Sequence, residues 1–214
     1  KNFDGEWNYE LVDGDRKTDF RTTGDVAFHM KALVDGNKTY VLYDSVLAIN
    51  QNRDATSGEI RLATRTSFDP GAWEYRTLES PTADATILGY DVEIAKTAKG
   101  IMASWFSATA LSMPDPTLLR TLNLSTAAAV VTTSTSNYGT PNELFSSDSK
   151  TLLFNCLGRL CAIDYAKFSK GQSAIALASS WQSTEPIASA WVVLNKIRYA
   201  VAGINGKVIL LKAA

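Results

Sequence analysis

The feature that most constrains this chain is a series of short strand-forming runs separated by sharp turn sequences. Near the C-terminus, Lys196–Ile204 and Lys207–Lys212 flank Asn205-Gly206. Asn-Gly is a strong hairpin signal, because both turn positions need a positive φ. The best helix competitor, Ile87–Lys99, contains Gly89 and several β-branched residues and lacks a good cap. The sequence therefore predicts an all-β chain.

The strand candidates fall into consecutive groups of four antiparallel strands, which is the content of one propeller blade. Only the last group has three members, and the N-terminal run Glu6–Asp13 is left over. The expected groups are Val26–Leu33, Lys38–Val46, Glu59–Arg65 and Trp73–Glu79; Tyr90–Thr97, Ile101–Ala108, Leu118–Leu122 and Ala127–Thr133; Asn142–Ser147, Thr151–Leu157, Leu160–Phe168 and Ser173–Ser179; and Ile187–Val193, Lys196–Ile204 and Lys207–Lys212.

This arrangement predicts a single domain over residues 1–214, a four-bladed β-propeller whose last blade is completed by the N-terminal strand Glu6–Asp13. Such closure removes the bare edges that an open row of sheets would present. A β-sandwich of two sheets is the alternative, because it also gives many short strands. A larger ring that takes further blades from another chain also stays open.

A repeat supports the propeller. Trp7–Asp13 and Trp73–Glu79 place Trp, Tyr, an aliphatic residue and an acid at the same offsets. Together with Asp54–Arg65, the second copy resembles the repeat of secreted bacterial β-propellers. That resemblance is good over Val41–Glu79 and weak over most of the rest, and it implies a fold and secretion, not an activity. The chain is similar to hemopexin-like propellers in size only.

Composition excludes several classes of partner. The formal net charge is −1, whereas nucleic-acid binders usually carry a basic excess. No apolar run approaches the ~20 residues that span a bilayer. The first residue is Lys1 rather than Met, which is the expected result of signal-peptide removal. We therefore expect a secreted, extracellular or cell-surface protein.

The two cysteines, Cys156 and Cys161, flank Leu157-Gly158-Arg159-Leu160. If Gly158-Arg159 is a two-residue turn, the cysteines lie directly opposite each other, about 4.5 Å apart between Cα atoms. A structural disulfide is the main expectation, with two buried thiols as the alternative.

Motifs for catalysis are missing, so the sequence predicts no catalytic residues, no metal-binding residues and no cofactor, and favours a protein that is not an enzyme. His29 is the one histidine, and it is expected to make a local hydrogen bond on a strand. A glycosidase needs only two carboxylates, and a channel cation needs only oxygen ligands. Both stay open, because five carboxylates could point into the channel, although they show no repeated spacing and are expected mostly at solvated rims or turns: Asp25, Asp91, Glu93, Glu143 and Glu185.

Ligand binding is expected on non-repeating aromatic residues and on long polar connections. The two connections are Ser45–Gly58 and Ala108–Pro116. The candidate residues are Trp105, Trp181, Tyr43, Asp44, Arg53 and Met113.

Three functions follow from these observations. The main expectation is a non-catalytic extracellular module that binds a glycan or a protein partner. The first alternative is a structural subunit of an extracellular or cell-surface assembly, built from copies of itself. The second is a glycoside-active enzyme with a carboxylate pair.

Overall fold

The computed structural model describes residues 10–14, 25–53, 55–66, 73–83, 86–108, 118–126, 131–134, 146–156, 159–165, 175–176, 188–204 and 206–212. Every regular element within these ranges is a β-strand, as the sequence predicts. Across the same ranges, no helix has the length and apolarity needed to cross a membrane.

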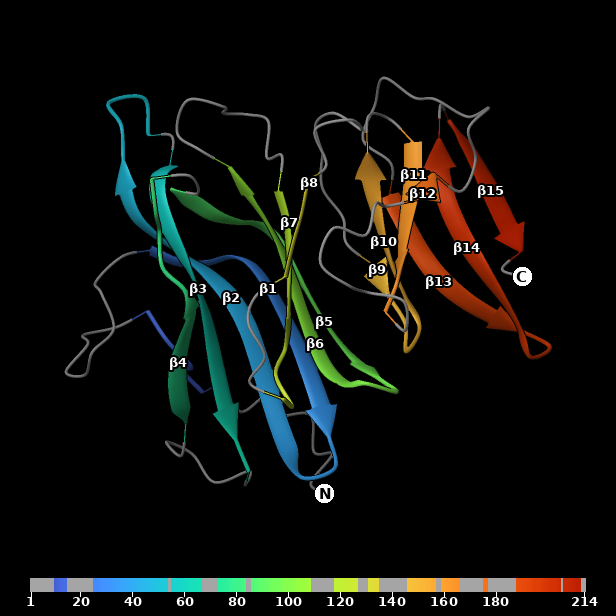
Figure 1. Cartoon of the computed structure of the whole chain (residues 1–214), viewed down its shortest axis with the longest axis horizontal. Coiled ribbons are helices and arrows are strands. Elements are labelled where there is room, and N and C mark those ends of the chain that lie inside the picture. The colour runs from blue at the N-terminus through green and yellow to red at the C-terminus, as the bar shows by residue number, and fades with distance from the viewer. Residues whose placement is uncertain are drawn as a thin grey trace, which may run out of the picture.

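The strands form four antiparallel sheets, named here from first to fourth (Figure 1). The first sheet contains β1 (Asp25–Asp35), β2 (Lys38–Ile49), β3 (Ala55–Arg65) and β4 (Glu74–Glu79). The second contains β5 (Ile87–Thr97), β6 (Gly100–Ala108), β7 (Leu118–Asn123) and β8 (Val131–Ser134). The third contains β9 (Ser146–Ser147), β10 (Thr151–Cys156), β11 (Arg159–Asp164) and β12 (Ile175–Ala176), and the fourth β13 (Ala188–Leu194), β14 (Ile197–Ile204) and β15 (Lys207–Lys212).

The grouping of strands into sheets is the one predicted from the turn sequences. Within each sheet, neighbours in sequence pair with each other. The two-sheet sandwich is therefore not what the described strands form. One predicted connection is much shorter than expected, because β2 continues to Ile49 and β3 begins at Ala55. Most of the predicted loop Ser45–Gly58 is paired strand.

Apolar side chains fill the spaces between consecutive sheets. Leu42 and Ile60 of the first sheet pack with Val92 and Trp105 of the second. Phe106 of the second sheet meets Phe154 of the third edge to face, with ring centroids 5.8 Å apart. The first strands of the sheets also contact one another in order, β1 with β5, β5 with β9 and β9 with β13. These strands therefore define one inner edge of the molecule.

The predicted closure by the N-terminal strand is wrong over its described residues. The fourth sheet has three strands among the residues that the structure describes. Glu10 instead bonds to Arg65 and Trp73, and the Tyr75 hydroxyl donates to the Val12 carbonyl at 2.6 Å. All three partners belong to the first sheet or adjoin it. Figure 1 draws the described N-terminal segment in blue beside β4, with the red fourth sheet on the other side of the molecule.

A buried charge cluster, here called the Arg61 cluster, explains this placement. It comprises Arg61, Glu59, Asp13 and Tyr43. The Arg61 guanidinium lies 2.5 Å from Glu59 and 3.2 Å from Asp13, and the Tyr43 hydroxyl donates to Asp13 at 2.8 Å. The Arg61 side chain is only 2% exposed. Asp13 thus shares the buried Arg61 cation of the first sheet with Glu59, and this contact holds the N-terminal segment against that sheet.

The cysteine hairpin has a different register from the predicted one. Cys156 is opposite Arg159, and Cys161 is opposite Phe154. The cysteines are therefore one diagonal step apart rather than directly opposed. Cys161 is buried and disulfide-bonded, and Cys156 is the other cysteine of the sequence. Because the Cys156 side chain lies outside the described residues, the Cys156–Cys161 pairing stays a prediction.

The outer face of the fourth sheet is apolar and exposed. Val192, Leu194, Val208 and Leu210 point to this face, and Val208 is 75% exposed. The opposite face packs on the third sheet through Ala200 and its neighbours. An apolar sheet face of this kind is a feature of interaction surfaces.

Candidate functional site

Two matching bulges interrupt β1 and β5 at the inner edge. In β1 the register shifts between Val26 and Met30, and in β5 it shifts between Leu88 and Val92. Ala27 and Gly89 occupy the same place in the two bulges and both have a positive φ, of 63° and 90°. Bulges and strained backbone often re-aim side chains at functional sites. The residues around these two bulges form the candidate site.

Asp44 is the carboxylate beside the first bulge. It lies on β2 and is 4% exposed. Its Oδ1 accepts the backbone N–H of His29 at 2.9 Å, and its Oδ2 lies 3.3 Å from the His29 ring Nδ1. The bulge in β1 brings the His29 N–H to this carboxylate, which fixes the orientation of Asp44.

Asp91 and Glu93 are the carboxylates of the second bulge, and they are 9% and 8% exposed. Each carboxylate accepts the N–H of the next residue, at 2.8 Å for Asp91 and 3.1 Å for Glu93. Glu93 Oε2 also lies 3.6 Å from the Lys31 ammonium of β1. This ion pair joins the two bulged strands at the site.

The site therefore contains three buried carboxylates on β2 and β5, with the His29 imidazole beside Asp44 and the Lys31 ammonium beside Glu93. Asp91 is the last residue of the bulge and Glu93 follows two residues later, where regular pairing with β6 has resumed. Paired carboxylates can exchange protons with a substrate, stabilise a developing cation and accept hydrogen bonds from hydroxyl groups. Among the described residues, no group of three or more His, Cys, Asp or Glu side chains could hold a metal ion.

Gly89 allows β5 to pack closely against β2 and β3. A Cβ on Gly89 would lie 2.5 Å from the Asp44 Cβ and 2.8 Å from the Ile60 Cδ1. We expect Gly89→Ala to lower the free energy of unfolding by about 2 to 3 kcal/mol, because the left-handed backbone and the clash both cost energy. Urea unfolding followed by tryptophan fluorescence measures this loss.

The matched control is Gly206→Ala. Gly206 also has a positive φ, of 71°, but its added Cβ would meet no atom within 4 Å. Only the backbone penalty of about 1 kcal/mol then applies. Equal losses for the two variants would show that β5 does not pack closely on Asp44.

Trp105 is not a ligand-binding residue of the expected kind. It is fully buried between the first and second sheets, so its ring is not available to stack on a sugar. Its indole N–H donates to Glu79 at 2.7 Å, and Glu79 also pairs with Arg120. Burial raises the pKa of Glu79, although Trp105 and Arg120 oppose that shift.

The other predicted ligand residues are scattered. Tyr43 is buried in the Arg61 cluster rather than exposed in a loop. Asp44 is also on a strand rather than in a loop, but it belongs to the candidate site. Arg53 is exposed in the turn between β2 and β3, so its role stays a prediction. Trp181 and Met113 lie outside the described residues.

The structure brings together only some of the candidate carboxylates. Asp91 and Glu93 form part of the site, whereas Asp25 is exposed at the start of β1. Glu143 and Glu185 lie outside the described residues. The predicted local hydrogen bond of His29 is confirmed by its contacts with Asp44.

Sequence reasoning missed Lys31 and the correspondence between the two bulges. Equivalent residues of β1 and β5 are 62 positions apart, as the pairs Val26 and Leu88 or Met30 and Val92 indicate. A glycine inside a strand pattern indicates a bulge, so Gly89 predicts the bulge in β5. Ala27 gives no such signal.

Comparison with known proteins shows similarity in fold only. No protein-family model and no curated protein sequence matches the chain, so the resemblance to secreted bacterial propeller repeats stays a prediction. The structure is similar to an α-L-arabinofuranosidase from Lactobacillus brevis, with a TM-score of 0.54 and 9% identity over 86% of this chain and 71% of that one. An α-L-arabinofuranosidase from Fusarium graminearum gives a TM-score of 0.49 and 11% identity over 88% of this chain and 57% of that one.

This similarity corrects the expectation that the chain is not an enzyme. That expectation depended on the absence of triad, phosphate-binding and histidine–metal motifs. The Lactobacillus brevis protein is a glycosidase by name and shares the fold, and glycosidases need only two carboxylates. The missing motifs therefore carry no weight against an enzyme.

Proposed function

We propose that the chain is a glycoside-active enzyme that uses carboxylates at the inner edge of β1 and β5. The observation that carries the proposal is that Asp44, Asp91 and Glu93 are all buried on β2 and β5 beside two matched bulges. The similarity in fold to an arabinofuranosidase supports it. The four sheets are then blades of a propeller that acts on an extracellular glycan.

Each carboxylate has a role in this proposal. Asp91 and Glu93 form the pair that protonates the leaving oxygen and assists the attack at the anomeric carbon. Lys31 pairs with Glu93 and keeps that carboxylate in place. Asp44, fixed by His29, accepts hydrogen bonds from the hydroxyl groups of the sugar.

A panel of 4-nitrophenyl glycosides tests this function. The panel includes the α-L-arabinofuranoside, together with α- and β-linked hexopyranosides and xylosides. The purified chain is expected to release nitrophenol from at least one furanoside or pentoside, in proportion to protein concentration. Asp35→Asn is the control for changed charge, because Asp35 lies on β1 but pairs with Lys96 outside the site. The proposal would be contradicted if an unrelated protein, purified in the same way, released nitrophenol at the same rate.

A structural subunit is the second candidate, and the exposed apolar face of the fourth sheet favours it. In this case copies of the chain would associate through Val208 and Leu210. Light scattering after size exclusion would then give a mass above one chain, which Val208→Lys/Leu210→Lys would reduce to one chain. A single-chain mass for the unchanged protein would exclude this candidate.

A further inference from the structure

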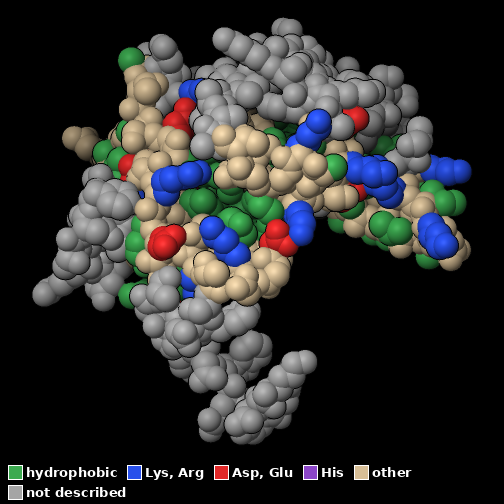
Figure 2. Space-filling view, turned by 60° about the horizontal axis from the view of Figure 1, so that its bottom comes forward, with side chains coloured by type: hydrophobic (Ala, Val, Ile, Leu, Met, Phe, Trp, Pro, Cys, Tyr) green, Lys and Arg blue, Asp and Glu red, His purple; other side chains and the backbone are tan. Residues whose placement is uncertain are grey.

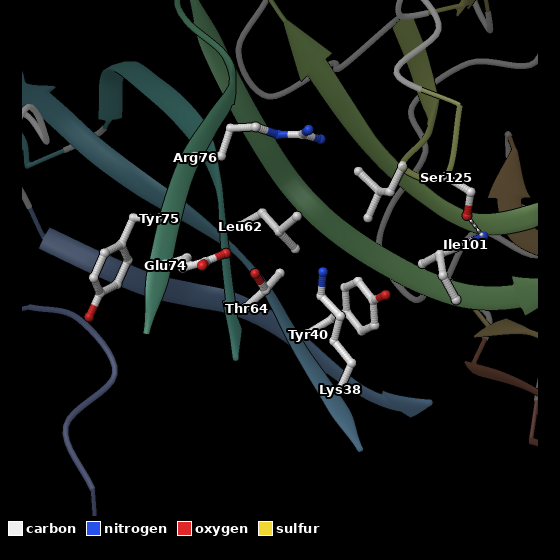
Figure 3. Close-up of a pocket in the computed structure, with 10 residues that line it drawn as sticks. Lys38, Tyr40, Leu62, Thr64, Glu74, Tyr75, Arg76, Ile101 and Ser125 are labelled. Atoms are coloured by element: carbon white, nitrogen blue, oxygen red, sulfur yellow. Dashed lines mark hydrogen bonds between the residues drawn. The ribbon is translucent and has the colours of Figure 1, made fainter. Parts of the chain in front are cut away.

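A pocket lies between the first and second sheets, and none of the inner-edge carboxylates lines it (Figure 3). Its volume is about 450 Å³, a size typical of small-molecule sites. Leu62 of β3, Ile101 of β6 and Leu124 form its apolar part. Figure 2 views the lower end of the molecule and shows apolar side chains among basic and acidic ones.

Two cations of this pocket have no carboxylate partner among the residues that the structure describes. The Arg76 side chain makes no ion pair or hydrogen bond with them, and its guanidinium points over the pocket in Figure 3. Lys38 lies 5.3 Å from the centre of the Tyr40 ring and has no acidic partner among the described residues. Unpaired cations that converge on a pocket favour an anionic ligand, and a guanidinium fork binds a carboxylate by two hydrogen bonds.

The rest of the lining suits hydroxyl groups. Glu74 points toward the pocket from β4 beside the Thr64 hydroxyl of β3 (Figure 3). A carboxylate here would repel a simple inorganic anion, but it accepts hydrogen bonds from the hydroxyl groups of a sugar. Burial, and then the charge of Asp35, raise the pKa of Tyr40 above its ordinary value, with Lys96 opposing. Tyr40 therefore keeps its hydroxyl proton and can donate it.

From these groups we infer that the pocket is a binding site for an acidic saccharide, a sugar ring that carries a carboxylate. Arg76 and Lys38 bind the carboxylate of such a ligand, while Glu74 and Thr64 bind its hydroxyl groups. The face of the ring packs on Leu62 and the other apolar residues. This site goes beyond the proposed hydrolysis and does not depend on it.

Isothermal titration calorimetry with the whole chain tests the inference. The probes are tri-galacturonate, its neutral counterpart galactotriose, and inorganic sulfate. Tri-galacturonate is expected to bind, and Arg76→Gln to weaken its binding about ten-fold or more, because one charged bidentate contact is lost. Lys207→Gln, an exposed cation on the fourth sheet, is the matched control and leaves the affinity unchanged.

Glu74→Gln separates a sugar site from an anion site. The variant keeps an amide oxygen that accepts a hydroxyl proton more weakly than the carboxylate, and it removes a repulsive charge. Sulfate binding is therefore expected to strengthen more than tri-galacturonate binding. Absence of tri-galacturonate binding, equal binding of galactotriose, or equal affinities in Arg76→Gln and Lys207→Gln would each overturn the inference. The experiment measures binding and not hydrolysis. If the chain binds tri-galacturonate but hydrolyses no glycoside, this inference holds and the proposed function fails. If the chain hydrolyses a glycoside but does not bind tri-galacturonate, only this inference fails.

Discussion

Glycoside hydrolysis by the Asp91→Asn and Glu93→Gln variants is expected to fall by about 100-fold or more. Each change removes one ionisable carboxyl and preserves its shape, and general acid–base catalysis contributes 10²- to 10⁴-fold. Initial rates on the best glycoside of the panel, at equal concentrations of folded protein, measure the loss. Asp35→Asn, at the far end of β1, should retain the full rate.

Stability measurements separate chemistry from folding in these variants. Glu93→Gln leaves Lys31 without its partner, but Lys31 is 41% exposed, so the free energy of unfolding should change by less than about 1 kcal/mol. Urea unfolding of both variants checks this. If either variant is as active as the unchanged protein, that carboxylate is not one of the catalytic pair.

The Arg61→Met variant is expected to lose about 3 to 5 kcal/mol of the free energy of unfolding. Methionine keeps much of the side-chain volume, but it leaves Glu59 and Asp13 buried without their cation. Removal of one partner from a buried ion pair typically lowers the free energy of unfolding by this amount. Their side chains are 6% and 4% exposed, so water cannot replace the guanidinium. Urea unfolding measures the difference.

Arg198→Met is the matched control. Arg198 also pairs with a carboxylate, Asp148, and it lies 4.5 Å from the centre of the Trp191 ring. Both charged side chains of that pair are 21% exposed, so its loss should cost no more than about 1 kcal/mol. Equal losses for Arg61→Met and Arg198→Met would show that the Arg61 cluster does not anchor the N-terminal segment.

The pairing of strands into sheets was predictable because local sequence determines it. The turn Asp35-Gly36-Asn37 joins β1 to β2, and Asn205-Gly206 lies between β14 and β15. Hairpins of this kind require only the right turn residues and strand formers on either side. Neighbouring strands therefore paired as expected in all four sheets.

Features that depend on distant residues were not predictable in the same way. The N-terminal strand was assigned to the fourth sheet by counting strands, whereas the partners of Glu10 and Asp13 are cations about fifty residues away. The turn of the cysteine hairpin lies one residue earlier than predicted. This shift places Cys156 opposite Arg159 instead of Cys161. A small shift in register changes which residues face each other across a pair of strands.

The sequence predicts only part of the candidate site. The sequence offers Asp91 and Glu93 as two of five carboxylates that could face the channel, but it favours solvated rim or turn positions for them, whereas the structure buries both on β5. Trp105 looked like a binding residue because it is a non-repeating tryptophan, but burial depends on which sheets face each other. The pocket beside Arg76 combines four strands and a turn from two sheets, so no local pattern marks it.

The release of free sugar from an arabinofuranoside, followed by NMR, tests the central claim most directly. The unchanged chain is expected to produce free arabinose at a steady rate, and Asp91→Asn/Glu93→Gln to produce none above the uncatalysed background. Equal production by the folded double variant, or no product from the folded unchanged chain on any glycoside of the panel, would contradict the assignment of chemistry to the bulged strands β1 and β5.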